Sequence, residues 1–137
     1  MKTLVALSVG AILVTSAAYS QSMSASRDLM ATVPASSLTV TDWYKQSVYD
    51  RSNSKIGDIS DVLVGQNGQV DAAIIGVGGF LGAGEKQVAV SFSSIKRAMK
   101  DDKVYLTLDT TKDALKNAPG FKYDSTKTSW VPDNSNK

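Results

Sequence analysis

The sequence contains neither cysteine nor histidine among its 137 residues. Without cysteine the chain can form no disulfide and use no thiol nucleophile. Without histidine it can build neither a serine–histidine–aspartate triad nor a zinc site of the usual kind. These absences exclude several of the commonest hydrolase and metalloenzyme classes, and they favour a protein that binds over one that catalyses.

A strong excess of charge of one sign is also missing. The chain has 15 basic and 13 acidic residues, for a formal net charge of +2. That balance is too even to produce a strong electrostatic footprint on nucleic acid or on an anionic membrane. Hydrophobic residues make up 42% of the chain, which together with its length fits one small domain with a modest core.

The N-terminus has the layout of a secretory signal peptide. Lys2 supplies a positive charge, Leu4–Val14 is an apolar run, and small residues follow up to Ser20. A retained membrane anchor is the alternative, but the run is well short of the roughly 20 residues that a spanning helix needs. We therefore expect residues 1–20 to be cleaved, which leaves an exported chain with no stable membrane insertion.

Two polar segments flank the centre of the chain. Residues 21–37 are rich in serine and alanine, and we expect them to form a flexible lead-in. Residues 124–137 form a polar tail whose apolar members are Trp130 and Val131. This tail is expected to be largely disordered unless Trp130 folds back onto the domain.

Between these segments, short runs of β-forming residues alternate with turn signals. Asn67-Gly68 suits a hairpin turn, and the broken alternation near Ser60-Asp61 predicts a bulge. Two short helices are expected, over 93–99 with a serine cap and over 110–117 capped by Thr110. The pattern predicts a small all-β domain that curls into a barrel. The expected strands cover residues 43–49, 56–64, 70–77, 87–92 and 104–108.

The order of these segments resembles a PRC-barrel domain over roughly Ser37 to Phe121. Lys55–Val64, followed by the Asn67-Gly68 hairpin, is similar to the opening of that domain. Ile75–Gly82, followed by Val88–Phe92, resembles the exported, stand-alone bacterial branch of the family. The resemblance implies a domain over 38–123 that folds as a small, partly open β-barrel with one or two short helices.

The family resemblance implies little about activity. Its members include a domain of the photosynthetic reaction-centre H subunit and one in a ribosome maturation factor, in which the barrel serves as a docking module. The family has no shared catalytic residues, so the resemblance implies no catalytic, cofactor or metal site. Combined with the predicted signal peptide, the resemblance implies an exported protein, which we expect in the bacterial periplasm.

Four residues are candidates for contact with a partner. Phe80 and Leu81 lie in the glycine-rich segment 76–86, where they could anchor a partner or, as we favour, cap the open end of the barrel. The glycines do not match a phosphate-binding loop, because Leu81 and Glu85 interrupt the required spacing. Trp43 and Tyr44 could form a contact surface, although core packing is the favoured interpretation of Trp43.

Three functions from different classes remain open. The leading hypothesis is a non-enzymatic envelope module that docks on a protein or self-associates through its barrel edge. The second is a small hydrolase or ligand-binding protein that uses Asp58 and Asp61 with a nearby serine or lysine; Asp71 belongs to the same carboxylate cluster. The third is an RNA-binding barrel, against which export and the balanced charge argue.

Overall fold

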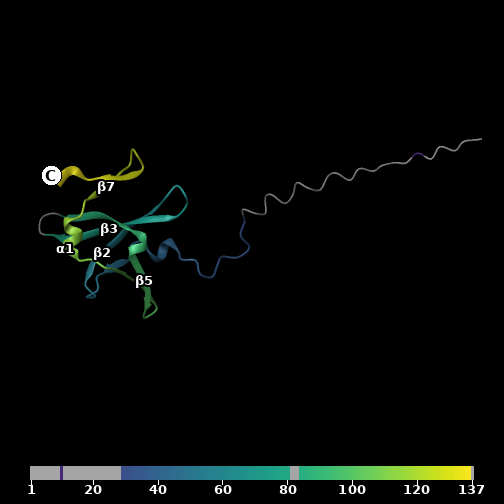
Figure 1. Cartoon of the computed structure of the whole chain (residues 1–137), viewed down its shortest axis with the longest axis horizontal. Helices are drawn as coiled ribbons and strands as arrows, with labels where there is room; N and C mark the ends of the chain where they lie inside the picture. The colour runs from purple at the N-terminus through teal and green to yellow at the C-terminus, as the bar shows by residue number, and fades with distance from the viewer. Residues whose placement is uncertain (1–9, 11–28, 81–83, 137) are drawn as a thin grey trace, which may run out of the picture. The chain divides into compact units, whose positions relative to one another are not determined.

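The computed structural model describes Gly10, residues 29–80 and residues 84–136. The chain divides into two units, Met1–Ser37 and Leu38–Lys137. In the first unit the described residues 29–37 are exposed throughout and contain neither helix nor strand. All described strands belong to the second unit (Figure 1). The predicted signal peptide lies outside the described residues except for Gly10, so export stays a prediction.

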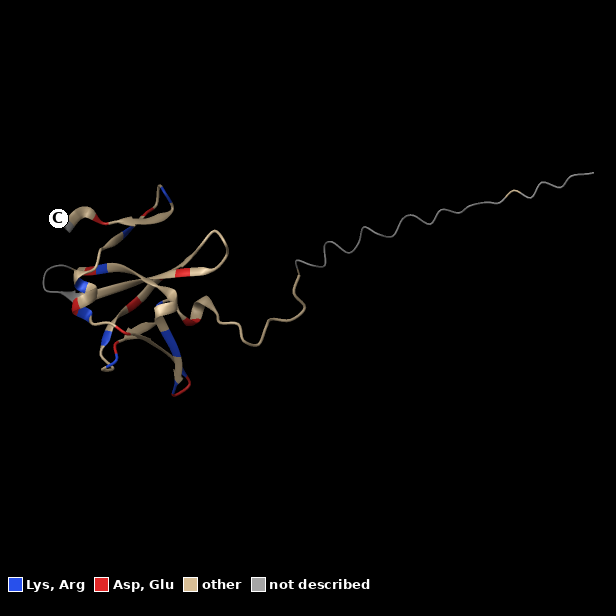
Figure 2. Cartoon of the chain, in the orientation of Figure 1, with Lys and Arg blue, Asp and Glu red and all other residues tan. Residues whose placement is uncertain are grey.

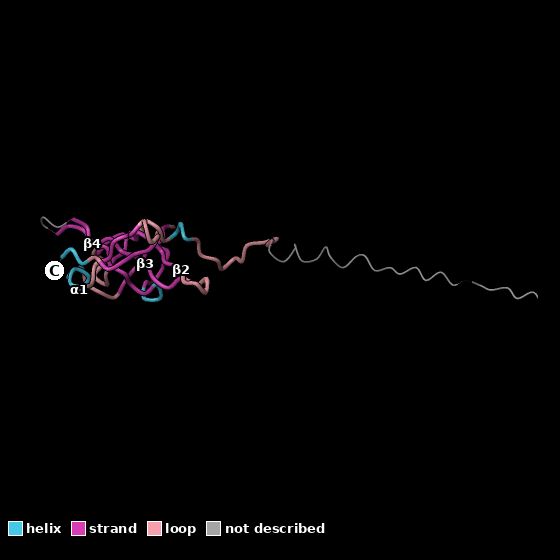
Figure 3. The backbone as a smooth tube through the Cα atoms, turned by 90° about the horizontal axis from the view of Figure 1, so that it is seen from above, coloured by secondary structure: helices cyan, strands magenta, loops and turns pink. Residues whose placement is uncertain are grey.

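The second unit is built on one eight-stranded sheet, and strand is its main structure (Figure 3). The strands lie in the order β5-β6-β1-β2-β3-β4-β7-β8, and β1 runs parallel to β6 while the other pairs are antiparallel. The predicted all-β fold is therefore confirmed. The strands are β1 (Ser47–Tyr49), β2 (Lys55–Val64), β3 (Val70–Phe80), β4 (Gly84–Ser91), β5 (Ile95–Lys100), β6 (Lys103–Leu108), β7 (Phe121–Asp124) and β8 (Ser129–Pro132).

The core lies on one face of this sheet, because alternate residues of a strand point to the same side. Ile75 pairs with Val88, and Val48 pairs with Leu106, so apolar side chains meet across neighbouring strands. Burial of these side chains is the main force that holds the strands together. The core cluster comprises Trp43, Val48, Ile56, Ile59, Ala73, Ile75, Val77, Val88, Ile95, Leu106, Leu108 and Leu115.

The predicted bulge in β2 is confirmed. Ile59 pairs with Ile75 while Asp61 pairs with Ile74, so Ser60 is the extra residue. Without a bulge, Asp58 and Asp61 would point to opposite faces. With it, both lie on the face that carries Ile74 and Gly76, opposite the core cluster.

The prediction of a largely disordered C-terminal tail is wrong for the described residues. β7 and β8 form a hairpin, and the exception that we allowed holds: the Trp130 indole Nε1 donates to Asp61 Oδ2 at 2.8 Å. Ile74 pairs with Asp61 and is 0% exposed although it lies outside the core cluster. We infer that the hairpin covers Ile74 on the face of the sheet opposite the core cluster.

The first predicted strand is shorter than expected. Residues Val40–Asp42 form a 3-10 helix (η1), and Trp43 follows as its C-cap. Lys45 then adopts a positive φ of 63°, which interrupts an extended chain, so β1 begins only at Ser47. The aromatic pair at 43–44 therefore lies in a turn before the sheet.

The helix predicted over 93–99 is also wrong. Residues Phe92–Ser94 form a single 3-10 turn (η2), and the chain continues as β5, which pairs with β6 from Ile95 to Lys100. Pairing with β6 places Ile95 in the core, opposite Leu108. Tertiary pairing thus overrides a local pattern that also suits a helix.

The second predicted helix is confirmed with a shifted cap. Helix α1 spans Lys112–Asn117, and the side chain of Thr111, not Thr110, accepts a hydrogen bond from Ala114 N at 3.1 Å. We expect Thr111→Ala to lower the free energy of unfolding by about 1 kcal/mol, because an N-terminal amide loses its partner. Thr110→Ala is the matched control in denaturant titrations, and equal losses in both variants would contradict the assignment.

Candidate functional site

Strand β5 ends the sheet, and no described strand pairs with its outer side. A two-residue turn with positive φ at Asp101 and Asp102 joins it to β6. The two residues that flank such a turn, here Lys100 and Lys103, form a backbone hydrogen-bonded pair. Moving away from the turn, non-hydrogen-bonded and hydrogen-bonded residue pairs then alternate, so Met99 and Arg97 belong to non-hydrogen-bonded pairs. The backbone N–H and C=O groups of Arg97 and Met99 therefore point away from β6. We call β5, residues Ile95–Lys100, the basic edge.

The charged side chains of the basic edge are all cations. Lys96 and Lys100 are exposed, whereas Arg97 is half-buried and reaches Asp42 Oδ2 at 3.4 Å. The acidic turn Asp101-Asp102 follows the strand, so the hairpin carries positive charge along its edge and negative charge at its tip (Figure 2). Within residues 96–103 there are four cations and two anions, an excess that equals the formal net charge of the whole chain, +2.

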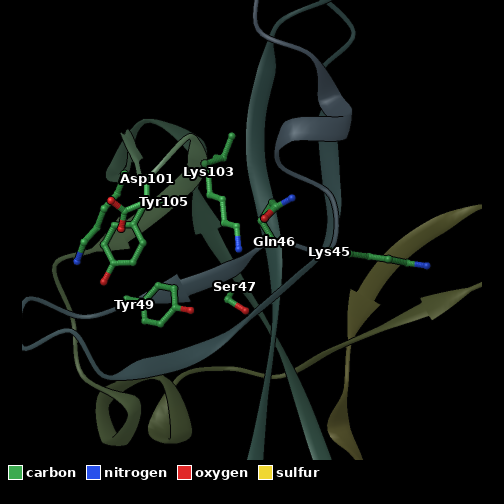
Figure 4. Close-up of a pocket in the computed structure, with 9 residues that line it drawn as sticks. Lys45, Gln46, Ser47, Tyr49, Asp101, Lys103 and Tyr105 are labelled. Atoms are coloured by element: carbon green, nitrogen blue, oxygen red, sulfur yellow. The ribbon is translucent and has the colours of Figure 1, made fainter.

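Beside the basic edge lies a cleft of about 700 Å³ between β1 and the β5–β6 hairpin (Figure 4). Tyr49 and Tyr105 both line it, and their rings stack with centroids 4.7 Å apart and planes 18° apart. We call it the tyrosine cleft. Desolvation raises the pKa of the Tyr105 hydroxyl, as do Tyr49 and Asp50, and the hydroxyl donates to Asn53 Oδ1.

Lysine side chains surround the two rings unevenly. Lys100 and Lys103 are direct cross-strand partners, and Lys100 Nζ lies 5.4 Å from the centre of the Tyr105 ring. Lys45 also lines the cleft, but Figure 4 shows its side chain pointing away from the tyrosines, and its Nζ lies 5.2 Å from the Tyr44 ring. Like charges directly opposite each other are unfavourable, so an anion near Lys100 and Lys103 would relieve their repulsion.

Of the predicted contact residues, Trp43 is not available to a partner. Its side chain is 5% exposed and packs on Phe92, with ring centroids 4.3 Å apart. The prediction that Trp43 is a partner contact is therefore wrong, and the favoured interpretation, that it packs in the core, is confirmed. Tyr44 is 47% exposed and stays a candidate. It lines a separate shallow cleft with Lys45 and Asp58, not the tyrosine cleft.

The predicted Phe80–Leu81 contact falls largely outside what the structure describes. The backbone of Phe80 ends β3, but its side chain and the whole of Leu81 are not among the described parts. The choice between cap and anchor therefore stays a prediction. The glycine-rich segment is not a simple loop, because β3 continues to Phe80 and β4 begins at Gly84.

The three carboxylates of the alternative hydrolase site have separate partners. Asp58 accepts from Ser47 Oγ and pairs with Lys55 Nζ, both at 2.8 Å. Asp61 accepts from the Trp130 indole, and Asp71 lies against Gly65 at the β2–β3 turn. Although the bulge places Asp58 and Asp61 on one face, the described clefts that include Asp58 do not include Asp61.

Two further observations concern the described part of the chain. No group of three or more acidic side chains there is arranged to hold a metal ion. None of its helices has the length and apolar character required to cross a membrane.

Sequence reasoning missed the basic edge. Its residues read as a short helix because Lys96, Arg97 and Lys100 follow a serine pair and recur at helical spacing. The available signal was Ile95, an apolar residue that lies thirteen positions before Leu108 across a turn of two aspartates. Reading 95–108 as one hairpin centred on Asp101-Asp102 would have found it.

Comparison with protein families matches residues 37–115 to the PRC-barrel domain. The matched segment begins three residues before η1 and ends within α1, so it includes β1 to β6, with the basic edge and the tyrosine cleft. The β7–β8 hairpin lies beyond it. No curated protein matches the chain. The structure is a single open sheet with few helical turns, and the family match covers more than half of the sequence. The chain therefore belongs to the PRC-barrel domain family.

Proposed function

We propose that this PRC barrel is a non-enzymatic binding module that takes an extended, acidic segment of a partner protein as an additional strand along β5. The observation that carries the proposal is the open outer side of the basic edge. There the backbone groups of Arg97 and Met99 have no strand partner within the described residues. Strand addition gives affinity through such main-chain groups and specificity through the alternating side chains.

The charge of the basic edge selects the class of partner. Lys96, Arg97 and Lys100 have no acidic neighbour within β5, so a second copy of the edge would bring cations against cations. Lysine on an edge strand is a common protection against such self-pairing. An acidic strand instead forms favourable cross-strand pairs with Lys96 and Lys100. We therefore favour an acidic partner over the self-association that the sequence left open.

The surroundings of β5 support a docking role in two ways. The core residues Ile95 and Leu108 anchor the strand at its start, which presents its edge in a fixed orientation. The tyrosine cleft continues from Lys100, and Lys103 extends its positive charge. A carboxylate at the end of the bound segment would lie near both lysines. Export to the bacterial periplasm belongs to the same proposal and depends on the predicted signal peptide.

A fluorescently labelled octapeptide of alternating glutamate and threonine tests the proposal by fluorescence anisotropy. We expect saturable binding that weakens as salt rises, and at least tenfold weaker binding by the Lys96→Glu/Lys100→Glu variant. The same peptide with lysine in place of glutamate should not bind. Equal binding of the two peptides would contradict the selection of an acidic partner.

A matched pair of variants separates strand pairing from charge attraction. Met99→Pro removes the outward N–H, whereas Met99→Ala keeps it, and neither changes the charge. We expect the proline variant to bind the acidic peptide about tenfold more weakly than the alanine variant, the effect of losing one hydrogen bond of about 1.4 kcal/mol. Equal affinities would show that the peptide does not pair with β5.

A further inference from the structure

A second cleft, of about 990 Å³, lies between β4, the segment after α1 and the C-terminal hairpin. We call it the hairpin groove. Its size suits a ligand of several rings. Most of its lining lies C-terminal to the segment that matches the PRC-barrel domain. The residues used below are Glu85, Lys86, Gln87, Lys122, Tyr123, Trp130 and Asp133.

Two aromatic rings form one wall of the hairpin groove. Tyr123 and Trp130 are cross-strand partners in the hairpin, with ring centroids 5.7 Å apart and planes at 67°. Tyr123 is 53% exposed, and Trp130 is half-buried. The bond from the indole N–H to Asp61 fixes the orientation of Trp130. The groove therefore presents an apolar aromatic surface that is already ordered before a ligand binds.

Polar groups of both kinds line the rest of the groove. The carboxylate of Glu85 accepts from Gln87 Nε2 at 3.1 Å. Asp133 accepts from the backbone N and the Oγ of Ser135, bonds that hold the pKa of Asp133 below its usual value, so it stays ionised. Lys86 and Lys122 also line the groove, but the Lys86 ammonium already donates to the Lys116 carbonyl oxygen at 2.6 Å, and the Lys122 ammonium lies 3.9 Å from Asp133. Because alternate residues of a strand point to opposite sides and Gln87 pairs with Phe121, Glu85 and Gln87 share the side of the aromatic pair, whereas the two lysines point to the other side.

We propose that the hairpin groove binds a neutral oligosaccharide. A pyranose ring has apolar C–H faces that can stack on Tyr123 and Trp130, and its hydroxyl groups both donate and accept. Its hydroxyl groups can therefore donate to the Glu85 carboxylate while the ring stacks on the aromatic pair. An anionic ligand would meet the negative charge of Glu85 on the same side of the groove.

A proline-rich peptide is the main competing ligand, since such peptides dock in aromatic-lined grooves. Proline carbonyls accept hydrogen bonds, and proline has no backbone N–H to donate. The Trp130 indole N–H, the usual donor of an aromatic wall, is already bonded to Asp61. The carboxylate of Glu85 would meanwhile gain no donor from the peptide, whereas it can accept from sugar hydroxyl groups. The hydrogen-bonding groups of the groove thus favour the oligosaccharide.

The two tryptophans of the chain provide a direct test in the intact protein. Their indole N–H signals are followed by heteronuclear NMR during titration with chitohexaose, cellohexaose and maltohexaose. We expect saturable movement of the Trp130 signal with at least one of these sugars, while the signal of the buried Trp43 stays fixed. No movement of the Trp130 signal with any of the three sugars would overturn the proposal, as would movement only with a proline-rich decapeptide.

Side-chain variants localise the binding. Tyr123→Ala should weaken the affinity for the bound sugar at least tenfold, and Tyr123→Phe, which keeps the ring, should restore most of it. Tyr44→Ala removes an exposed tyrosine outside the groove and should leave the affinity unchanged. An equal loss in the Tyr44 and Tyr123 alanine variants would place the sugar elsewhere. These results do not depend on the acidic-peptide experiment, which concerns the other end of the sheet.

Discussion

A Leu106→Ala variant is expected to lose about 2–5 kcal/mol of the free energy of unfolding, because it combines lost burial with a cavity. Leu106 is 0% exposed and lies in β6, where it pairs with Val48 on one side and Arg97 on the other. It therefore joins β1 and the basic edge through the core. Urea or guanidinium titration followed by tryptophan fluorescence measures the loss.

Leu38→Ala is the matched control, since it is the same substitution at a side chain that is 56% exposed. Its expected loss is within about 0.5 kcal/mol. The Leu106 variant should also bind the acidic peptide more weakly at temperatures near its unfolding transition, because β5 loses its support. Equal stabilities of the two variants would contradict the position of the core.

The second large effect is expected at Gly57, where β2 passes close to β3. A Cβ atom there would lie 2.5 Å from the backbone oxygen of Gly76 and 2.7 Å from Ile75 Cγ2. Backbone cannot move aside as a flexible side chain can, so the strands must separate. We expect Gly57→Ala to lower the free energy of unfolding by about 3 kcal/mol, the upper range of overpacking costs.

Gly78→Ala tests whether the effect is steric. Gly78 lies in β3, where no heavy atom of the described residues comes within 4 Å of the position a Cβ would take, and its φ is not positive. Alanine should be neutral or stabilise by up to about 1 kcal/mol, since glycine weakens strands through its backbone freedom. Chemical denaturation of both variants gives the comparison. A Gly57→Ala protein as stable as Gly78→Ala would show that β2 and β3 do not approach so closely.

The centre of the sheet could be predicted because local and tertiary preferences agree there. β2 and β3 are rich in β-branched and other apolar residues and are joined by a turn that contains Asn67-Gly68, and Gly68 adopts the positive φ of 79° that this turn requires. The bulge at Ser60 was visible as a break in alternation. That bulge also decides the orientation of Asp61, which the sequence left open between two faces.

The edges of the sheet were harder to predict, because their structure depends on distant partners that a local pattern does not show. β5 pairs with β6 in spite of a helix-like local pattern, and the C-terminal hairpin is tied by Trp130 to Asp61, 69 positions earlier in the chain. Trp43 and Tyr44 are adjacent and chemically similar, yet one is buried and the other exposed. Both lie in the turn after η1, which directs the side chain of Trp43 into the core and leaves that of Tyr44 in solvent.

The two proposed sites differ in their relation to the family. The basic edge and the tyrosine cleft lie within residues 37–115, the segment that matches the PRC-barrel domain. The hairpin groove is built mainly by residues that follow it. A variant truncated before β7 would remove the groove but also uncover Ile74 and the edge of β4, so point substitutions are the better test.

Amide hydrogen exchange at β5 tests the central claim most directly. In the free protein, the outward-pointing amides of Arg97 and Met99 should exchange quickly, whereas those of Ala98 and Lys100, bonded to β6, should be protected. Saturation with the acidic glutamate–threonine peptide should slow exchange at Arg97 and Met99 at least tenfold. If both amides exchange at the same rate in the free and the saturated protein, the partner does not add as a strand to this edge and the account is wrong.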